Sequence, residues 1–430
     1  MTLTGRAALT ALVGGLAVLA FRTTAVLLIV NAVIGAGIVA DLILAGGIRQ
    51  LRLSRSGDTK IHLGQTGSTG LTIANTGRRT VRGVVRDAWR PSAGAQPGRA
   101  GLRVPAGGTV TVSTALTPRR RGDAVAGKVT VASLGPLGLA GRQRSLDAPW
   151  TVRVLPPFLS RKHLPAKLAR LRELDGQHKS LIRGQGSEFD SLRNYVLGDD
   201  VRSIDWRSSA RNADVLVRTW RPERDRRIIV VLDTGRTSAG RVGSIPRLDA
   251  SMDAALLLAA LATRAGDRVD FLAIDRRVRA RVVGAGRLGV LAAVTSAMAT
   301  LEPDLIESDI GLMASTVLGI ARQRSLVVLL TDLSPAAIEQ GLLPQVQLLT
   351  SRHQLIVAGV ADPRLAQMAA SRGDISAIYD AAAAARAQSG RAHVSALLRR
   401  HGVEIVDAPP DSLAPALADA YLSLKAAGRL

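Results

Sequence analysis

The chain has 430 residues, which is enough for two or three folded units. It contains no cysteine, and this excludes disulfides, thiolate metal sites and cysteine nucleophiles. The formal net charge of +23, from 57 basic and 34 acidic residues, indicates an acidic partner such as nucleic acid or anionic lipid. The alternative explanation of this charge is a GC-rich genome, because arginine codons are rich in G and C, combined with a surface that faces a membrane.

The apolar N-terminal segment, residues 1–48, is predicted to form a transmembrane helical hairpin. Its second apolar run, most of residues 25–47, has about 23 residues and is long enough to span a bilayer core. The first run, residues 7–21, is shorter, and a snorkelling Arg6 extends it. Only Arg22, Thr23 and Thr24 separate the two runs, so both flanks of the hairpin lie on one side of the membrane.

The charges around this hairpin predict its orientation. Arg22 alone lies in the connecting loop, whereas the flanks carry Arg6, Arg49, Arg52, Arg55 and Lys60. The positive-inside rule then predicts a multi-pass protein of the plasma (inner) membrane with cytoplasmic soluble domains. The alternative is a signal peptide that ends near Ala20, followed by one anchor. Asp41, within the second run, is either a functional intramembrane carboxylate, or an interfacial carboxylate, or one that pairs with Arg49.

Residues 49–156 contain short runs of alternating polarity, which predict a small β-sandwich. Turn signals separate these runs, among them Asn75-Thr76-Gly77 and Gly135-Pro136. No catalytic cluster is visible in this part of the sequence.

Residues 227–430 are predicted to form an α/β doubly wound domain, because apolar strands alternate with helices. The expected strands are residues 227–233, 268–274, 278–283 (an edge strand), 326–331, 355–360 and 403–406. The expected helices are residues 248–264, 288–301, 310–322, 335–350, 377–400 and 413–426. Asp233 and Asp332 each end a strand. If these strands are neighbours where the strand order reverses, both carboxylates converge on one crevice, and paired carboxylates with hydroxyls suit Mg²⁺.

The segment Asp233-Thr234-Gly235-Arg236-Thr237 resembles the metal-ion-dependent adhesion site of von Willebrand factor A domains, which has Asp-x-Ser-x-Ser on its first loop. The resemblance implies a site for Mg²⁺ formed by Asp233, Thr237 and Asp332. Gly235 departs from the motif because it replaces the first serine. The threonine that the motif places on a second loop has Ser308 or Ser315 as its candidate counterpart.

Residues 186–211 resemble the signature of the DUF 58 family of bacterial proteins, and this likeness is long and specific. The residues that carry it are Glu188, Phe189, Arg193, Tyr195, Gly198, Asp199, Asp200, Arg202, Asp205, Trp206, Arg207 and Arg211. Residues 119–122, 136–139 and 421–425 also look like that family, so the likeness covers essentially the whole chain. It implies a two-span anchor, a β domain and a von Willebrand factor A-like domain, at residues 1–48, 49–156 and 227–430. Such proteins are typically encoded beside MoxR-type AAA+ ATPases, which suggests an adaptor or chaperone-like role.

The signature itself, residues 186–211 within the segment 157–226, interleaves acidic and basic residues with apolar anchors. Bidentate pairs between its arginines and carboxylates would lock it onto the neighbouring domain. The alternative is a face that binds a partner or a phosphate.

Together these patterns predict a membrane-anchored, non-enzymatic adaptor that works with a MoxR-type AAA+ ATPase in complex assembly or envelope-linked maturation. A first alternative is an anionic-lipid or nucleic-acid binder, although an aromatic content of 3% is low for stacking on nucleic acid. A second alternative is a metal-dependent hydrolase that uses Asp233 and Asp332, against which the Gly235 departure argues.

Overall fold

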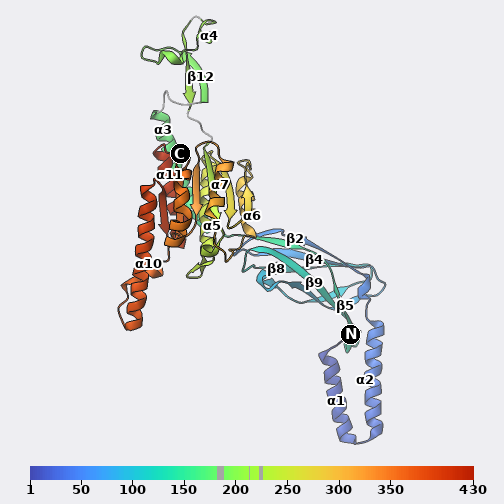
Figure 1. Ribbon diagram of the computed structural model, residues 1–430. Coiled ribbons are helices and arrows are strands. Elements are labelled where there is room, and N and C mark those ends of the chain that lie inside the picture. The colour runs from blue at the N-terminus through green and yellow to red at the C-terminus, as the bar shows by residue number, and fades with distance from the viewer. Residues whose placement is uncertain (182–187, 213, 222–225) are drawn as a thin grey trace. The chain divides into compact units, whose positions relative to one another are not determined.

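The computed structural model describes residues 1–181, 188–212, 214–221 and 226–430. These residues form two compact units, Met1–Pro157 and Phe158–Leu430 (Figure 1). The chain is therefore multidomain, with N-terminal helices, a β-rich region and a mixed sheet covered by helices.

Two apolar helices, α1 (Gly5–Phe21) and α2 (Thr24–Leu44), begin the first unit and lie side by side as a hairpin (Figure 1). Thr4 and Thr23 cap them, because each side chain accepts a hydrogen bond from a backbone N–H of the first turn. Within the described residues, only the helical segment Thr24–Gln50, which includes η1 (Ile48–Gln50), is long and apolar enough to cross a membrane, and 6% of its apolar window is buried. The other helix, α1, is shorter, at 17 residues.

Asp41 does not pair with Arg49, so that part of the sequence prediction is wrong. Its side chain is fully buried, and its carboxylate accepts hydrogen bonds from the backbone N–H groups of Leu137 (2.8 Å), Leu139 (2.6 Å) and Ala140 (3.0 Å). These donors lie at the junction of β9 (Gly122–Leu134) and β10 (Ala140–Leu146). The β-rich region therefore holds the end of α2 directly.

The β-rich region consists of two sheets, with two clusters of buried apolar side chains. One sheet has the order β2-β4-β8-β6, with strands at Leu51–Gly57, Gly67–Asn75, Thr109–Leu116 and Ala95–Gln96. The other has the order β1-β10-β9-β11-β3, with β5 beside β9 and β7 beside β5; its further strands are Thr2–Leu3, Thr151–Leu155, Lys60–His62, Val81–Trp89 and Ala100–Val104. Side chains from both sheets, such as Leu71, Ile73, Val129 and Val131, are buried together, as sandwich packing requires.

Arg55 was expected among the cations that flank the hairpin, but it belongs to the core of this sandwich. Its guanidinium forms a buried ion pair with Asp87 and lies 5.5 Å from the ring centroid of Trp89. Asp87 also accepts a hydrogen bond from the Thr114 hydroxyl (3.1 Å). One of the cations counted for membrane orientation is thus unavailable to the membrane surface.

The second unit is built on a sheet with the strand order β18-β17-β14-β19-β20-β21. These strands are Val278–Val282, Arg268–Ile274, Arg227–Asp233, Leu326–Leu330, Gln354–Val360 and Glu404–Ala408. All neighbours are parallel except the edge strand β18. The strand order reverses between β14 and β19, which are hydrogen-bonded neighbours.

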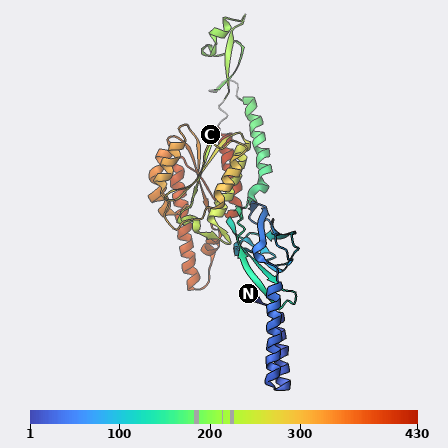
Figure 2. The same ribbon diagram turned by 90° about the vertical axis from the view of Figure 1, so that its right-hand side faces the viewer.

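Helices cover both faces of this sheet (Figure 2). On one face lie α5 (Arg247–Arg264), α6 (Val290–Ala299) and α11 (Pro410–Ala426). On the other lie α7 (Ile310–Ile320), the π-helical turn η6 (Ala337–Leu342), α8 (Leu343–Thr350) and α10 (Ile375–Arg400). The other α-helices described in this unit are α3 (Leu164–Leu181), the short α4 (Trp206–Ser209) and α9 (Pro363–Ala370). Successive residues of β14 alternate between the two cores, as strands of a covered parallel sheet do.

A buried polar network fastens α11 to the start of β17. The Tyr421 hydroxyl donates to Asp267 (2.5 Å), and the Lys425 ammonium lies 3.0 Å from the same carboxylate. All three side chains are buried. The segment of residues 421–425 singled out in the sequence therefore has a structural role here, because it neutralises a carboxylate that packing removes from water.

His353, at the start of β20, is a buried titratable group. The residue is 3% exposed, and neither ring nitrogen has a hydrogen-bond partner among the described residues. Burial, and secondarily the charge of Arg352, lower its pKa below the ordinary value. The folded state thus binds this proton less readily than the unfolded chain does. The free energy of unfolding therefore keeps its full value above the unfolded pKa of about 6.5. It decreases as the pH falls below that value toward the lowered pKa of the folded state.

We predict that His353→Leu reduces the loss of stability on acidification, because the variant has no buried imidazole to charge. Thermal unfolding followed by circular dichroism between pH 7.5 and pH 5.5, both about one unit from the unfolded pKa, measures this. The melting temperature of the variant should rise relative to the unsubstituted protein as the pH falls. His393→Leu, at an exposed position on α10, is the matched control. A difference that stays constant with pH would contradict the prediction.

Candidate functional site

The strand ends that the sequence singled out lie at one edge of the central sheet. Asp233 is the last residue of β14, and Thr331 and Asp332 follow β19 directly. Because the two strands are parallel neighbours at the point of strand reversal, their carboxyl ends meet where open parallel sheets bind ligands. This edge is therefore the first candidate site.

Hydroxyl and amide donors surround the buried carboxylate of Asp233. Its Oδ1 accepts hydrogen bonds from the backbone N–H of Gly235 (2.8 Å) and from the hydroxyl of Ser308. Its Oδ2 accepts a hydrogen bond from the Thr331 hydroxyl (2.6 Å), and the Thr237 hydroxyl lies at 3.5 Å. Thr237, the predicted ligand, is thus the most distant of these donors.

Ser308 explains why position 235 is glycine. A Cβ atom at Gly235 would overlap the Ser308 hydroxyl and lie 2.9 Å from the carbonyl oxygen of Ile306. The loop that carries Ser308 is held there, since the backbone N–H of Arg236 donates to Ile306 (2.7 Å). Of the two candidate serines, Ser308 reaches the site, whereas Ser315 donates to a carbonyl oxygen of its own helix. A hydroxyl from another loop thus occupies the space that the motif's first serine would fill.

Asp332 makes a different set of contacts from Asp233. Its carboxylate pairs with Arg391 of α10 (2.7 Å) and with Arg247 of α5 (3.1 Å). Arg391 also pairs with Asp407 at the end of β21 (2.7 Å). Burial alone would lower the pKa of Arg391, but the two carboxylates outweigh this effect and raise it. Arg391 therefore stays charged and neutralises Asp332 inside the protein.

Asp275 is a further carboxylate at this edge, which sequence reasoning missed. It follows β17 and is fully buried, and it accepts hydrogen bonds from the Thr234 hydroxyl (3.0 Å) and from Arg279 (2.7 Å). Burial by itself would raise the pKa of Asp275. The hydrogen bonds from Thr234, Arg279 and the backbone N–H of Arg277 together lower it by more, so the net shift of the pKa is downward. The signal that would have found it is the one used for Asp233: an Asp directly after a buried apolar strand.

These contacts do not fit a divalent cation. Mg²⁺ needs oxygen lone pairs in octahedral array and a site of net negative charge. Here two guanidinium groups already pair with Asp332 and neutralise it, so only the carboxylate of Asp233 and the hydroxyls around it remain as oxygen ligands. Among the described residues, no group of three or more His, Cys, Asp or Glu side chains has a metal-binding arrangement. Asp233, Thr237 and Asp332 would bind metal only after Arg247 and Arg391 moved away.

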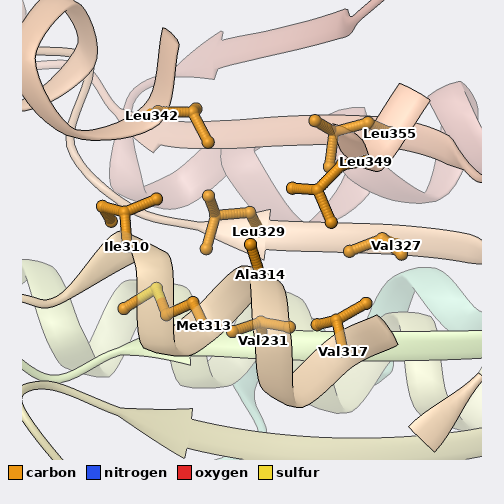
Figure 3. Close-up of a pocket in the computed structure, with 10 residues that line it drawn as sticks. All are labelled: Val231, Ile310, Met313, Ala314, Val317, Val327, Leu329, Leu342, Leu349 and Leu355. Carbon is orange, nitrogen blue, oxygen red and sulfur yellow. The ribbon is translucent and has the colours of Figure 1, made fainter. Parts of the chain in front are cut away.

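Two hollows lie elsewhere in this unit. The first, between α7, α8 and the sheet, is lined only by apolar side chains, which Figure 3 shows pointing toward one another. Its volume of about 10 Å³ is at the lower limit for one water molecule, so it is a packing gap rather than a ligand site. The second, of about 700 Å³, lies at the amino ends of β14 and β19 and is lined by Arg226, Arg227, Arg322 and Arg324, among others.

The family signature forms a small substructure, which we call the arm, residues 188–221. Strands β12 (Glu188–Asn194) and β13 (Leu216–Arg221) pair antiparallel, and η4 (Val201–Ser203) and α4 (Trp206–Ser209) lie between them. The side chains of Glu188 and Phe189 lie outside the described ones. Gly198 has a φ of +107°, a backbone conformation that favours glycine, in the turn before Asp199.

The described ion pairs of the arm join residues within the arm. They do not form the connection to a neighbouring domain that the sequence predicted. Arg193 makes a bidentate pair with Asp199 (2.6 and 2.7 Å). Asp205 pairs with Arg218 (2.8 Å), a residue that sequence reasoning missed, and caps α4 at the backbone N–H of Ser208. Asp200 caps η4 through a backbone N–H. These contacts shape the arm itself.

The arm leaves large apolar side chains in solvent. Leu197 is 96% exposed and Trp206 is 65% exposed, and Val196 and Val201 are exposed as well. Tyr195 is only half-buried, and its backbone N–H donates a hydrogen bond to the carbonyl oxygen of Val215, just before β13. The remaining signature arginines are exposed: Arg202, Arg207 and Arg211. The arm is thus internally braced and exposes apolar side chains together with arginines, which is the composition of an interaction surface.

We predict that Arg391→Ala lowers the free energy of unfolding by about 3 kcal/mol, because Asp332 and Asp407 lose a buried, charged hydrogen-bond donor. Chemical unfolding with magnesium and with EDTA measures both stability and metal binding. The unsubstituted protein should unfold at the same denaturant concentration in both conditions, and magnesium should stabilise only the variant.

Arg386→Ala, at an exposed position of the same helix, is the matched control and should unfold like the unsubstituted protein. Stabilisation of the unsubstituted protein by magnesium, reversed by EDTA, would contradict the cation-free assignment and restore the metal site.

Several solved structures show distant likenesses to this chain. The CARDB domain of the PF1109 protein from Pyrococcus furiosus, in complex with di-metal ions, is 14% identical over 24% of this chain and 91% of that chain, with a TM-score of 0.18. Proximal thread matrix protein 1 from the mussel byssus is 13% identical over 47% of each chain (TM-score 0.27). The RO protein of Deinococcus radiodurans is 16% identical over 47% and 35% (TM-score 0.23). Likenesses this low carry no argument.

Uncharacterized proteins of Mycobacterium tuberculosis and Mycobacterium bovis are 26% identical to this chain over 194 residues. The match covers 44% of this chain, and the chain spans 60% of the length of these curated relatives. Residues 191–376 match the DUF58 family, which is described as a protein of unknown function. Residues 119–122, 136–139 and 421–425 lie outside that match, so their likeness to the family stays a prediction. The chain therefore contains a DUF58-family domain, which begins in the arm and runs through the carboxyl edge of the central sheet.

Proposed function

We propose that this protein is a membrane-anchored, non-enzymatic adaptor that captures a protein partner through the arm. The observation that carries the proposal is the exposure of Leu197 and Trp206 on a substructure that two internal ion pairs, Arg193–Asp199 and Arg218–Asp205, brace. Tryptophan and arginine dominate the binding energy of protein interfaces, and a braced scaffold lowers the entropy lost on binding.

The arm indicates the chemistry of its partner. Exposed Arg202, Arg207 and Arg211 stand among the exposed apolar residues, so the complementary surface has an apolar pocket with an acidic rim. The resemblance to the DUF58 family names a MoxR-type AAA+ ATPase as the first partner to test. Work in complex assembly or envelope-linked maturation belongs to this same proposal.

The second unit acts in this proposal as a von Willebrand factor A-like scaffold without a metal. The reversal of strand order between β14 and β19 and the antiparallel edge strand β18 support that fold. The internal pairing of Asp332 with Arg247 and Arg391 supports the absence of metal-dependent recognition. A metal-dependent hydrolase is less well supported, because it needs a tightly held ion at these carboxylates.

Membrane anchoring is the other half of the proposal. The apolar segment Thr24–Gln50, scarcely buried within the protein, supports one span, and the adjacent α1 supports a two-span hairpin. Arg49, Arg52 and Lys60 beyond the hairpin are exposed and support a cytoplasmic position of the soluble regions in the plasma membrane.

We predict that Trp206→Ala weakens capture of the partner by about 2 kcal/mol, roughly 30-fold in Kd, as loss of an interface hot spot does. Capture from native membranes in mild detergent, with proteins identified by mass spectrometry, measures the loss. Titration of the purified partner then gives the Kd.

Tyr379→Ala is the matched control, since Tyr379 is an aromatic side chain, 74% exposed, on α10 outside the arm. Capture should be equal in magnesium and in EDTA. Undiminished capture by Trp206→Ala would overturn the arm as the docking surface. Loss of capture in EDTA alone would instead point to the carboxyl-edge residues.

Binding of a phosphate-bearing anion is the second candidate function, and the basic hollow at the amino ends of β14 and β19 favours it. Arg227 there is committed to Asp270 (2.5 Å), whereas Arg322 and Arg324 are exposed. Replacing Arg322 and Arg324 with Ser should weaken binding to anionic vesicles and flatten its dependence on salt. Vesicle sedimentation measures this, and single-stranded DNA in a parallel titration separates lipid from nucleic acid. Unchanged binding would remove the hollow from consideration.

A further inference from the structure

We propose that the loop Gly135–Leu139, here called the interface loop, inserts into the lipid interface and sets the depth of the helical hairpin. The inference rests on the membrane anchoring proposed above. The inference adds that the β-sandwich contacts the bilayer directly through this loop, and that it is not connected to the membrane by a flexible linker alone.

The interface loop is fastened to both helices of the hairpin. At α2, the buried carboxylate of Asp41 accepts the backbone N–H groups of Leu137, Leu139 and Ala140, at 2.6–3.0 Å. Gly135 leaves no room for a side chain against Asp41. Ahead of α1, the Thr4 hydroxyl donates to the carbonyl oxygen of Gly138 (2.5 Å), and β1 pairs with β10. The loop and the base of the hairpin therefore form one rigid junction.

The leucines of this loop extend along α2 toward the tip of the hairpin. An added Cβ atom at Gly37, one turn beyond Asp41, would lie 2.9 Å from Leu139 Cδ1 and 3.7 Å from Leu137 Cδ1. Leu137 nevertheless stays 53% exposed. A large apolar side chain exposed beside an apolar helix is stabilised when lipid covers both.

The length of the hairpin requires this depth. From Asp41 to Thr24, α2 rises about 26 Å, and α1 is about 24 Å long, at 1.5 Å per residue. The hydrocarbon core of a bilayer is about 30 Å thick. For the polar turn at Arg22 and Thr23 to reach the opposite headgroups, the Asp41 junction must lie at or slightly within the near interface. The interface loop is then in contact with lipid.

The charges at the junction are arranged for that position. A carboxylate near hydrocarbon is costly unless donors satisfy it, and Asp41 has three such donors and no exposure. The guanidinium of Arg6 lies beside Gly138, and Arg79 donates to the carbonyl oxygen of Ile43 (2.6 Å). Both arginines are exposed, so their charges can reach phospholipid headgroups.

The absence of cysteine from the sequence allows a direct test by site-directed spin labelling of the full chain. Leu137→Cys carries the label in the interface loop. Leu16→Cys, on an exposed position of α1, reports the bilayer interior. Val125→Cys, an exposed aliphatic position toward the opposite end of β9, reports water. In vesicles of phosphatidylcholine and phosphatidylglycerol, collision rates with oxygen and with a water-soluble nickel chelate rank the three labels by depth.

We expect the label at position 137 to collide with the nickel chelate far less than the label at position 125, and to approach the label at position 16 in its preference for oxygen. If labels 137 and 125 are equally accessible to nickel while label 16 is protected, the hairpin is inserted and the inference about the loop is overturned. If label 16 is itself accessible to nickel, the membrane anchoring fails, and the inference fails with it.

Discussion

Burial of both faces of the central sheet is the constraint on which the rest of the second unit depends. Five parallel strands packed between helices have no side on which a charge can meet water, so their side chains are almost entirely aliphatic. Charged groups are thereby concentrated near the strand ends, and the buried Asp270 within β17 is paired with Arg227 (2.5 Å). Asp233, Asp275 and Asp332 lie at the carboxyl edge for this reason, and each needs a partner there because packing removes its carboxylate from water.

The partners chosen decide what that edge can do. Asp233 and Asp275 are satisfied by hydroxyls, amides and Arg279, and Asp332 by two arginines from helices on opposite faces of the sheet. These arrangements bind loops and helices together, and they commit the carboxylates of Asp233, Asp275 and Asp332 to internal contacts. Buried carboxylates of the first unit also have internal partners: Asp87 pairs with Arg55, and Asp41 accepts hydrogen bonds from backbone N–H groups.

The exposed apolar side chains that have no covering partner within the described residues lie in other parts of the chain. The hairpin and the interface loop present apolar side chains beside exposed arginines, which suits a phospholipid interface. The arm presents apolar side chains beside arginines on a braced β-hairpin, which suits an acidic protein partner. One chain thus presents a surface suited to lipid and a surface suited to a protein partner. These two surfaces are the physical basis for proposing an adaptor that holds a partner at the membrane.

The sequence by itself determined most elements, because the periods of apolar residues in helices and strands are local signals. It also placed Asp233 and Asp332 at strand ends, since an apolar run stops where a charge begins. Only the tertiary structure decided which groups those carboxylates meet. Ser308 rather than Ser315 reaches Asp233, Arg391 reaches Asp332 from 59 residues away, and Asp41 binds a loop 96–99 residues later instead of nearby Arg49. Such pairings depend on strand register and loop paths, which the whole chain sets when it folds, and no local pattern encodes them.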